Sequence, residues 1–328
     1  MPDPKLPHRQ LGGLPVSTVG LGCMSLSGVY GEADDKTSED LIRHAIDHGV
    51  DHLDSSDMYG WGHNEDVIGR AIKGRRDQVV LATKFGQVQR PGQSNGVNGH
   101  PDYVQQACEA SLKRLNEDVI DLYYQHRVDP NVPVEDTVGA MKRLVEQGKV
   151  RFLGLSEARP DRIKAAHAVH PIAAVQTEYS LLYRAEAEET RGLTRALGIG
   201  FVAYAPLGRG FLAGTIKTFA DVDGRRAAHP RFQKENFDQN RALVERIETI
   251  AKEKNCTPAQ LTLAWLLAQG EDVVAIPGTR HAARLDENAG ALKVTLSADE
   301  IGRIDAAVPK GAAAGTRYPA GGMTGVFI

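Results

Sequence analysis

The sequence predicts an α/β fold, a (β/α)8 TIM barrel with an N-terminal β-hairpin and extra helices. Short apolar runs alternate with amphipathic helical stretches, and eight strand–helix pairs can be counted along the chain. A doubly wound sheet would show fewer strands and a glycine-rich first turn. The 328 residues suffice for a sizeable core, and neither a repeat nor a linker divides them, so we expect a single domain over 1–328.

The predicted elements follow from hydrophobic periodicity and from glycine and proline punctuation. Strands are expected at 19–22, 52–54, 79–84, 120–125, 150–155, 174–177, 200–205 and 273–276. Helices are expected at 41–46, 64–72, 101–115, 134–147, 160–169, 186–197, 240–254, 258–269, after the eighth strand, and at 298–308. The segment 9–19, with Gly12-Gly13 inside it, resembles a β-hairpin that caps the barrel floor.

Three other segments carry no regular pattern. The stretches 85–100 and 207–239 are long for loops of a compact domain, and such loops are usually functional or mobile. The last residues, 309–328, are rich in glycine and alanine, which suggests a flexible tail.

Composition argues against several classes of protein. A net charge of −3 without a long basic stretch disfavours nucleic acid or an anionic membrane as the main partner. The three cysteines are too few and too scattered for a disulfide framework or a zinc site, which fits a reducing cytoplasm. Neither a signal region nor an apolar run of about 20 residues is present. We therefore expect a cytoplasmic protein with a small-molecule ligand, either a monomer or a homo-oligomer.

Four ionisable residues follow three successive predicted strands. Asp54 ends the second strand, Tyr59 lies in the loop after it, Lys84 ends the third strand and His126 follows the fourth. Each residue alone has an ordinary structural explanation, such as a turn aspartate or a solvated lysine. In a barrel, however, these strand ends meet at one mouth, where active sites lie. Together the four residues predict a catalytic site.

Their chemistry suits proton donation to a carbonyl oxygen. A free phenol has a pKa of about 10 and is a poor acid at neutral pH. An ammonium about 4 Å away stabilises the phenolate by about 4 kcal/mol at an effective dielectric of 20, so we expect Lys84 to bring the pKa of Tyr59 toward neutrality. Asp54 would hold Lys84, and His126 would hydrogen-bond the substrate oxygen or relay the proton. None of these groups needs a metal, and we expect no metal site.

The motifs around these residues resemble the signature of the aldo-keto reductase family. The stretch 49–60 with Asn64-Glu65, the stretch 80–85 around Lys84, and Tyr124-Gln-His126-Arg127 carry the resemblance, which extends over about 9–309. It implies that Asp54, Tyr59, Lys84 and His126 are a catalytic tetrad. It further implies reduction of aldehydes or ketones by hydride transfer from NADPH, with Tyr59 as the proton donor.

The resemblance also implies a cofactor site. Ser156 and Gln176 stand where the family binds the carboxamide, Tyr204 where it stacks on the nicotinamide ring, and Gly22 and Met24 would line that end. The stretch 276–288 resembles the family's adenosine-phosphate motif, implying roles for Ile276, Gly278, Thr279, Arg280, Arg284, Glu287 and Asn288. Arg280 and Arg284, four residues apart, would lie on one helix face and clamp a 2′-phosphate.

The segment 208–213 nearly matches a dinucleotide fingerprint, but it lacks the strand–helix–strand context, so an ordinary glycine-bearing loop is favoured. Because barrels often bind phosphate after strands seven and eight, the same loop could instead hold the pyrophosphate. The residues concerned are Pro206, Leu207, Gly208, Arg209, Gly210 and Lys217. Trp61, Phe85 and Arg127 are candidates for the wall of the substrate pocket.

Two positions depart from the family pattern. Glu157 follows Ser156 where relatives often carry asparagine, and Gly278 stands where many carry lysine. Both bear on how the cofactor is held and on the preference for NADPH over NADH. The main alternative function is an NADPH-binding regulatory or redox-sensing subunit on the same fold, because such relatives can keep an intact tetrad. A lyase or isomerase is disfavoured by the nicotinamide motifs.

Overall fold

The computed structural model describes residues 6–28, 33–89 and 96–328. One parallel sheet has the strand order β12-β11-β10-β9-β8-β5-β4-β3. Single bridges from Val19 to Ala275 and from Gly22 to Gly278 join its two edges, so the sheet closes into a barrel. A Cβ on Gly22 would lie 2.7 Å from the Ile276 carbonyl oxygen, so this closure requires glycine.

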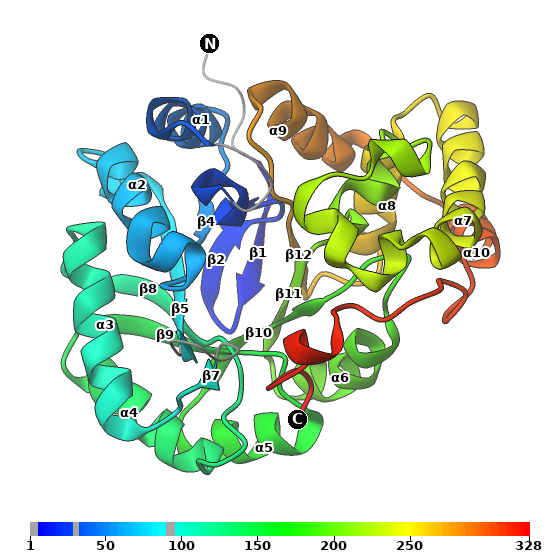
Figure 1. Cartoon of the computed structure of the whole chain (residues 1–328). Coiled ribbons are helices and arrows are strands. Elements are labelled where there is room, and N and C mark those ends of the chain that lie inside the picture. The colour runs from blue at the N-terminus through cyan, green and yellow to red at the C-terminus, as the bar shows by residue number, and fades with distance from the viewer. Residues whose placement is uncertain (1–5, 29–32, 90–95) are drawn as a thin grey trace.

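The strands are β3 (Leu21–Gly22), β4 (His52–Asp54), β5 (Val80–Phe85), β8 (Ile120–Gln125), β9 (Val150–Ser156), β10 (Ile172–Glu178), β11 (Gly200–Tyr204) and β12 (Val273–Ile276). The helices are α1 (Asp35–Asp47), α2 (His63–Ile72), α3 (Pro101–Leu115), α4 (Val134–Glu146), α5 (Pro160–Val169), α6 (Ala185–Ala196), α7 (Lys234–Glu253), α8 (Pro258–Leu267), α9 (Ala282–Ala289) and α10 (Ala298–Ala307). The helices form a ring around the strands (Figure 1), which confirms the predicted barrel.

Most element bounds fall within two residues of the prediction, and the starts of α1 and α7 are the main exceptions. α1 begins at Asp35, six residues before the expected 41–46. α7 begins at Lys234, six residues earlier than the expected 240–254. The extra turn buries Phe237, whose ring packs against Phe211 at a centroid distance of 5.4 Å. This contact joins α7 to the loop after β11, a partner that local periodicity does not reveal.

A hairpin of β1 (His8–Leu11) and β2 (Leu14–Ser17) closes the bottom of the barrel, as expected. Leu11, Leu14 and Val16 pack with barrel-lining residues such as Val202 and Val274 in one buried cluster. Apolar side chains therefore seal the floor, and the open end of the barrel is the one at the carboxyl ends of the strands.

The two long loops and the tail lie around that open end. In the first loop, β6 (Gln87–Val88) pairs with β7 (Gly96–Val97), and residues 90–95 lie outside the described ranges. The second loop is a series of short 3-10 turns. The tail, shown in red in Figure 1, runs across the mouth beside α6, and its Arg317 is only 1% exposed. The sequence suggested a flexible tail and gave no sign that Arg317 is buried.

Candidate active site

Asp54, Lys84 and Tyr59 meet in one hydrogen-bonded group, and His126 lies against it. The Lys84 ammonium donates to an Asp54 carboxylate oxygen and, at 2.6 Å, to the Ser55 carbonyl, and it lies 3.5 Å from the Tyr59 hydroxyl. The other Asp54 oxygen accepts a bond of 2.8 Å from the Gln176 amide. Asp54 and Lys84 are fully buried at the ends of β4 and β5, so their geometry is fixed by the barrel wall.

Burial controls the proton affinities within this group. It disfavours the Lys84 ammonium, but Asp54 and then Tyr59 outweigh it, and the pKa of Lys84 is raised above its ordinary value. Burial also raises the pKa of Tyr59, and Lys84 opposes the rise without reversing it. The expectation that Lys84 brings this phenol toward neutrality is therefore wrong for the free protein, because desolvation of the phenolate outweighs its attraction to the ammonium. Tyr59 is held as a protonated phenol beside a charged lysine.

His126 lies edge-on to the Tyr59 ring at a centroid distance of 5.9 Å. Burial, and then the neighbouring Arg127 and Lys84, keep its pKa well below the ordinary value, so its imidazole is neutral. The Nδ1 atom is 3.0 Å from the Ser56 hydroxyl. A neutral ring with one nitrogen held in this way has the other nitrogen left for a ligand.

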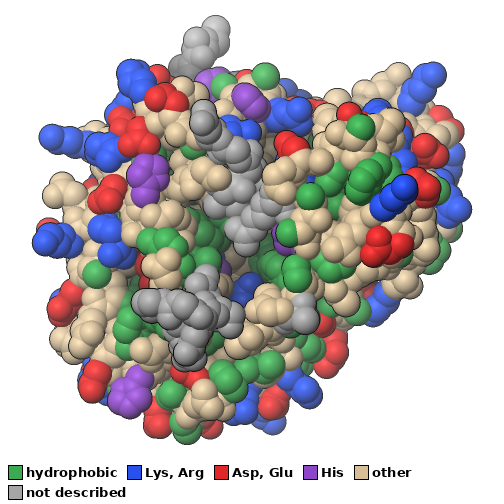
Figure 2. All heavy atoms as spheres, in the orientation of Figure 1, with side chains coloured by type: hydrophobic (Ala, Val, Ile, Leu, Met, Phe, Trp, Pro, Cys, Tyr) green, Lys and Arg blue, Asp and Glu red, His purple; other side chains and the backbone are tan. Residues whose placement is uncertain are grey.

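A cavity of about 660 Å³ extends from this group across the barrel mouth, where Figure 2 shows the surface hollowed near its centre. Asp54, Tyr59 and His126 line it, while Lys84 lies directly behind them. Most residues predicted to hold a cofactor line it as well: Gly22, Met24, Ser156, Gln176, Tyr204, Pro206, Leu207, Arg209, Gly210, Ile276, Gly278, Thr279, Arg280, Arg284, Glu287 and Asn288. The tetrad and these residues therefore face a single continuous space.

Another part of the cavity wall is built by β12 and the start of α9. Arg280 precedes the N-cap residue His281, while Arg284 lies inside the helix. The expectation that the two arginines share one helix face is therefore wrong, because Arg280 lies before the helix begins, but both line the cavity. A helix start with free backbone amides and two cations nearby suits a phosphate group.

Comparison with known proteins agrees with this architecture. The model of the aldo/keto reductase family matches residues 18–309. The chain belongs to the aldo/keto reductase family.

Its curated relatives include "Probable aldo-keto reductase 1" of Glycine max, 50% identical over 93% of this chain and 89% of that protein. Another is "Aldo-keto reductase yakc [NADP(+)]" of Schizosaccharomyces pombe, 46% identical over 98% of this chain and 97% of that protein. Among solved structures, the glycerol dehydrogenase AKR11B4 of Gluconobacter oxydans has a TM-score of 0.83 at 27% identity, covering 92% of this chain and 94% of its own. An aldo-keto reductase of Klebsiella pneumoniae in complex with NADP and acetate has a TM-score of 0.73 at 27% identity, covering 96% of this chain and 99% of its own. The protein is accordingly an oxidoreductase of this family.

Besides Lys84, four predicted site residues do not line the cavity. Phe85 is fully buried in the barrel wall and stacks on Tyr123, and Gly208 is buried beneath the loop. Lys217 points outward and pairs with Glu248 at 2.7 Å. Trp61, 44% exposed, borders a separate shallow depression. Of the three candidates for a substrate wall, only Arg127 lines the main cavity.

Arg209 is the predicted phosphate ligand whose surroundings differ most from expectation. Its guanidinium is paired with the buried Glu178 carboxylate at 3.0 Å, which Arg231 also contacts at 2.7 Å. Burial alone would raise the pKa of Glu178, but the two arginines outweigh it and hold that pKa at about 2. Glu178 therefore orients this guanidinium at the cavity wall. The loop turns sharply here, since Arg209 and Gly210 both have positive φ, and the Gly210 amide donates to the Leu207 carbonyl at 3.0 Å.

Sequence reasoning missed the part of the wall that comes from the second long loop and the tail. Arg226 and His229 line the cavity, as do the tail residues Tyr318, Gly321, Gly322 and Thr324. The Tyr318 hydroxyl is 2.9 Å from that of Tyr204. The length of the loop was a usable signal for this region, but the tail carried none because its composition resembles that of a disordered segment.

Glu157, the departure from the family pattern, anchors this tail. It has a positive φ of 57° and is fully buried. Its two carboxylate oxygens accept bonds of 2.8 and 2.7 Å from Arg317, and its carbonyl accepts one of 2.7 Å from the Phe327 amide. The carboxylate thus faces the tail and does not line the cavity.

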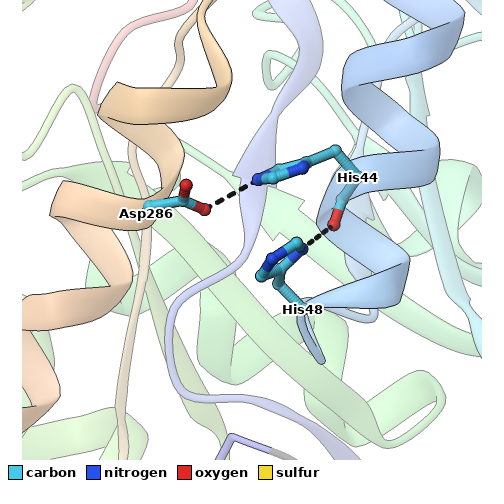
Figure 3. A group of neighbouring side chains, drawn as sticks. All are labelled: His44, His48 and Asp286. Carbon is cyan, nitrogen blue, oxygen red and sulfur yellow. Dashed lines mark hydrogen bonds and ion pairs between the residues drawn. The ribbon is translucent and has the colours of Figure 1, made fainter. Parts of the chain in front are cut away.

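Within the described ranges, one group of side chains outside the cavity has ligand atoms close enough to share a metal ion. It consists of His44 and His48 on α1 and Asp286 on α9 (Figure 3), with ligand atoms within 4.8 Å of one another. The histidine pair on α5 behaves as a structural pair, because His167 accepts a bond of 3.1 Å from the Ile172 amide. In the part of the chain that the structure describes, no helix is long and apolar enough to cross a membrane.

Proposed function

We propose that this protein is an NADPH-dependent reductase that converts aldehydes and ketones to alcohols. The observation that carries the proposal is the shared cavity, which is lined both by a protonated phenol beside a charged lysine and by Arg280 and Arg284. Two relatives support the cofactor, since the S. pombe protein is named for NADP(+) and the K. pneumoniae structures contain NADP or NADPH. The substrate would be a small carbonyl compound, and the three free cysteines, two of them buried, fit a cytoplasmic protein.

The lining of the cavity fits such a cofactor. Gln176 uses its amide donor on Asp54, which leaves its side-chain oxygen to accept from a carboxamide, and Ser156 lies beside it on β9. Tyr204 ends β11 as a flat wall, while Arg280 and Arg284 supply positive charge where α9 begins. When bound, NADPH supplies the hydride that reduces the carbonyl carbon.

The tetrad would supply the proton. Tyr59 donates its phenolic proton to the carbonyl oxygen as negative charge develops there, and Lys84 stabilises the phenolate that results. Asp54 keeps the ammonium charged and in place. With Ser56 donating to Nδ1, neutral His126 offers its other N–H to the substrate oxygen.

The test is the loss of NADPH absorbance with a panel of aldehydes and ketones, comparing wild type with Tyr59→Phe. We expect turnover by wild type and a loss of about 10²–10⁴-fold in the variant, the usual worth of a general acid. Equal rates would exclude Tyr59 as the proton donor. Tight NADPH binding without turnover of any substrate would instead favour a regulatory or redox-sensing subunit.

A further inference from the structure

The cavity wall beside the tetrad contains a buried cation that the proposed mechanism does not use. Arg127 directly follows His126 and is only 7% exposed. One of its nitrogens donates to the His126 carbonyl at 2.8 Å and lies 3.4 Å from the Ser156 hydroxyl. Its guanidinium lines the cavity at the end where the tetrad lies.

Neighbouring buried arginines have carboxylate partners, and Arg127 has none among the described residues. Arg209 and Arg231 share Glu178, and Arg317 holds both oxygens of Glu157. The groups that act on Arg127 are the hydroxyl-bearing Tyr204 and Tyr318, and then Glu157 and Arg317. Both oxygens of Glu157 are already bound by Arg317, so this carboxylate makes no direct pair with Arg127. A guanidinium cannot lose its charge in a protein, and a buried charge without a counter-ion is costly.

We propose that Arg127 binds an anionic group of the substrate, so that the preferred substrates are carbonyl compounds bearing a carboxylate, such as keto acids or semialdehydes. The inference rests on the proposed function and deepens it. Arg280 and Arg284, at the start of α9, suit the phosphates of a cofactor, whereas Arg127 adjoins the residue that would bind the carbonyl oxygen. A carboxylate there would supply the missing counter-charge in a water-poor site, and a guanidinium can hold it with two parallel bonds.

The test compares two substrates that differ in charge, 4-carboxybenzaldehyde and its neutral methyl ester. Wild type should prefer the carboxylate in kcat/KM, and Arg127→Met should lower the ratio of the two values by about ten- to hundred-fold, the usual worth of hydrogen bonds to a charged group. Arg127→Lys should keep part of the preference. The matched control is Arg303→Met, at an arginine 55% exposed on α10, which should leave the ratio unchanged. A ratio is insensitive to the folded fraction, so partial misfolding does not mimic the effect.

An unchanged ratio in Arg127→Met would overturn the inference while leaving the reductase proposal standing. A fall in kcat/KM for both substrates that matches a weaker Kd for NADPH would also overturn it, because Arg127 would then serve the cofactor. If neither aldehyde is reduced, the proposed function fails. Calorimetry with benzoate on the NADP⁺-saturated protein then decides the anion site, since binding lost in Arg127→Met supports the inference and absence of binding by wild type contradicts it.

A different observation, at the outer surface, carries a second inference. His44 and His48 stack on one face of α1 with ring centroids 3.9 Å apart, and Asp286 of α9 lies 2.8 Å from His44 Nε2 (Figure 3). His48 Nδ1 is 2.8 Å from the His44 carbonyl, so this nitrogen carries the proton and Nε2 keeps its lone pair. Fixing the second imidazole nitrogen in this way is typical of metal-ligating histidines.

We infer that these three side chains can bind a zinc ion that links α1 to α9. Two imidazoles and one carboxylate suit tetrahedral zinc with water as the fourth ligand, and their partial exposure leaves access from solvent. Zinc–ligand bonds of about 2.0–2.2 Å require the ligand atoms to close in from their present spacing by small side-chain rotations. The ion would brace the helix that carries Arg284 and Asn288.

The test uses ZnCl₂ alone, with calorimetry and thermal unfolding. We expect one ion per chain and a rise in Tm of a few degrees at saturation, reversed by EDTA. Both effects should be lost in His48→Gln and in Asp286→Asn and kept in His170→Gln, a histidine outside the group. Absence of binding by wild type, or binding that the first two variants retain, would contradict the inference and leave His44–Asp286 as a simple hydrogen-bonded pair.

Discussion

The two ends of the cavity are built differently. At the tetrad end, Asp54 and Lys84 sit on adjacent strands, are fully buried, and are fixed by several hydrogen bonds. At the other end, Arg284 is exposed on a helix and Arg280 lies in the turn before it. Under the proposed function, the chemistry would depend on rigid, desolvated groups, whereas the charge of the cofactor would be met by groups that remain in contact with water. Variants at the two ends should therefore fail in different ways.

The largest effect is expected from Lys84→Met. Without the ammonium, the phenolate of Tyr59 loses its main stabilising charge, and kcat should fall by about 10²–10⁴-fold. The change also leaves the buried Asp54 carboxylate unpaired, at a cost on the order of 3–5 kcal/mol of stability. The double variant Lys84→Met/Asp54→Leu is the control, since it should recover stability in urea unfolding without recovering activity. Recovery of both would contradict the role of Lys84.

The tail wall should prove as important for stability as the barrel wall. Arg317→Met leaves the carboxylates of Glu157 and Glu186 without their shared guanidinium. We expect a loss on the order of 3–5 kcal/mol in the free energy of unfolding, together with a higher KM because Tyr318 no longer borders the cavity. Glu157→Gln in the same chain should restore part of the stability. If Arg317→Met unfolds at the same denaturant midpoint as wild type, the tail contributes nothing to the free energy of unfolding.

A smaller effect concerns Asp57, next to the tetrad. Burial first, and then the nearby Glu65, raise the pKa of this carboxyl to about 7. Because the folded state keeps a proton that the unfolded state has lost above about pH 4, stability should decline as the pH rises from about 4 to 7. Asp57→Asn should remove this decline and be more stable than wild type at pH 8, by about 1–2 kcal/mol. Parallel stability–pH curves for the two proteins would contradict the raised pKa.

The smallest effect is expected at the exposed end. Arg284→Met should weaken NADPH binding by about ten-fold, or about 1.4 kcal/mol, and leave NADH binding nearly unchanged, because only NADPH carries the extra phosphate. Fluorescence titration with both cofactors gives the comparison. Equal losses for NADPH and NADH would mean that Arg284 does not contact the 2′-phosphate.

The sequence predicted what depends on local pattern. The predicted strand bounds 52–54 and 120–125 matched the structure. Because the carboxyl ends of all strands in a barrel lie at one mouth, these bounds also placed Asp54, Lys84 and His126 together. Contacts between distant segments could not be read in this way. Glu157 and Arg317 are separated by 160 positions, and neither local composition nor periodicity indicates that they pair. The sign of the shift in the pKa of Tyr59 also depended on burial, which a spacing argument does not supply.

The most direct test of the account is a paired measurement on Tyr59→Phe and Arg284→Met, with NADPH Kd and single-turnover rate determined for each. Tyr59→Phe should lose about 10²–10⁴-fold in the chemical rate with a Kd for NADPH within about two-fold of wild type. Arg284→Met should bind NADPH about ten-fold more weakly and keep the wild-type chemical rate. If Tyr59→Phe weakens NADPH binding and turns over bound NADPH at the wild-type rate, the division of labour between the two ends is wrong.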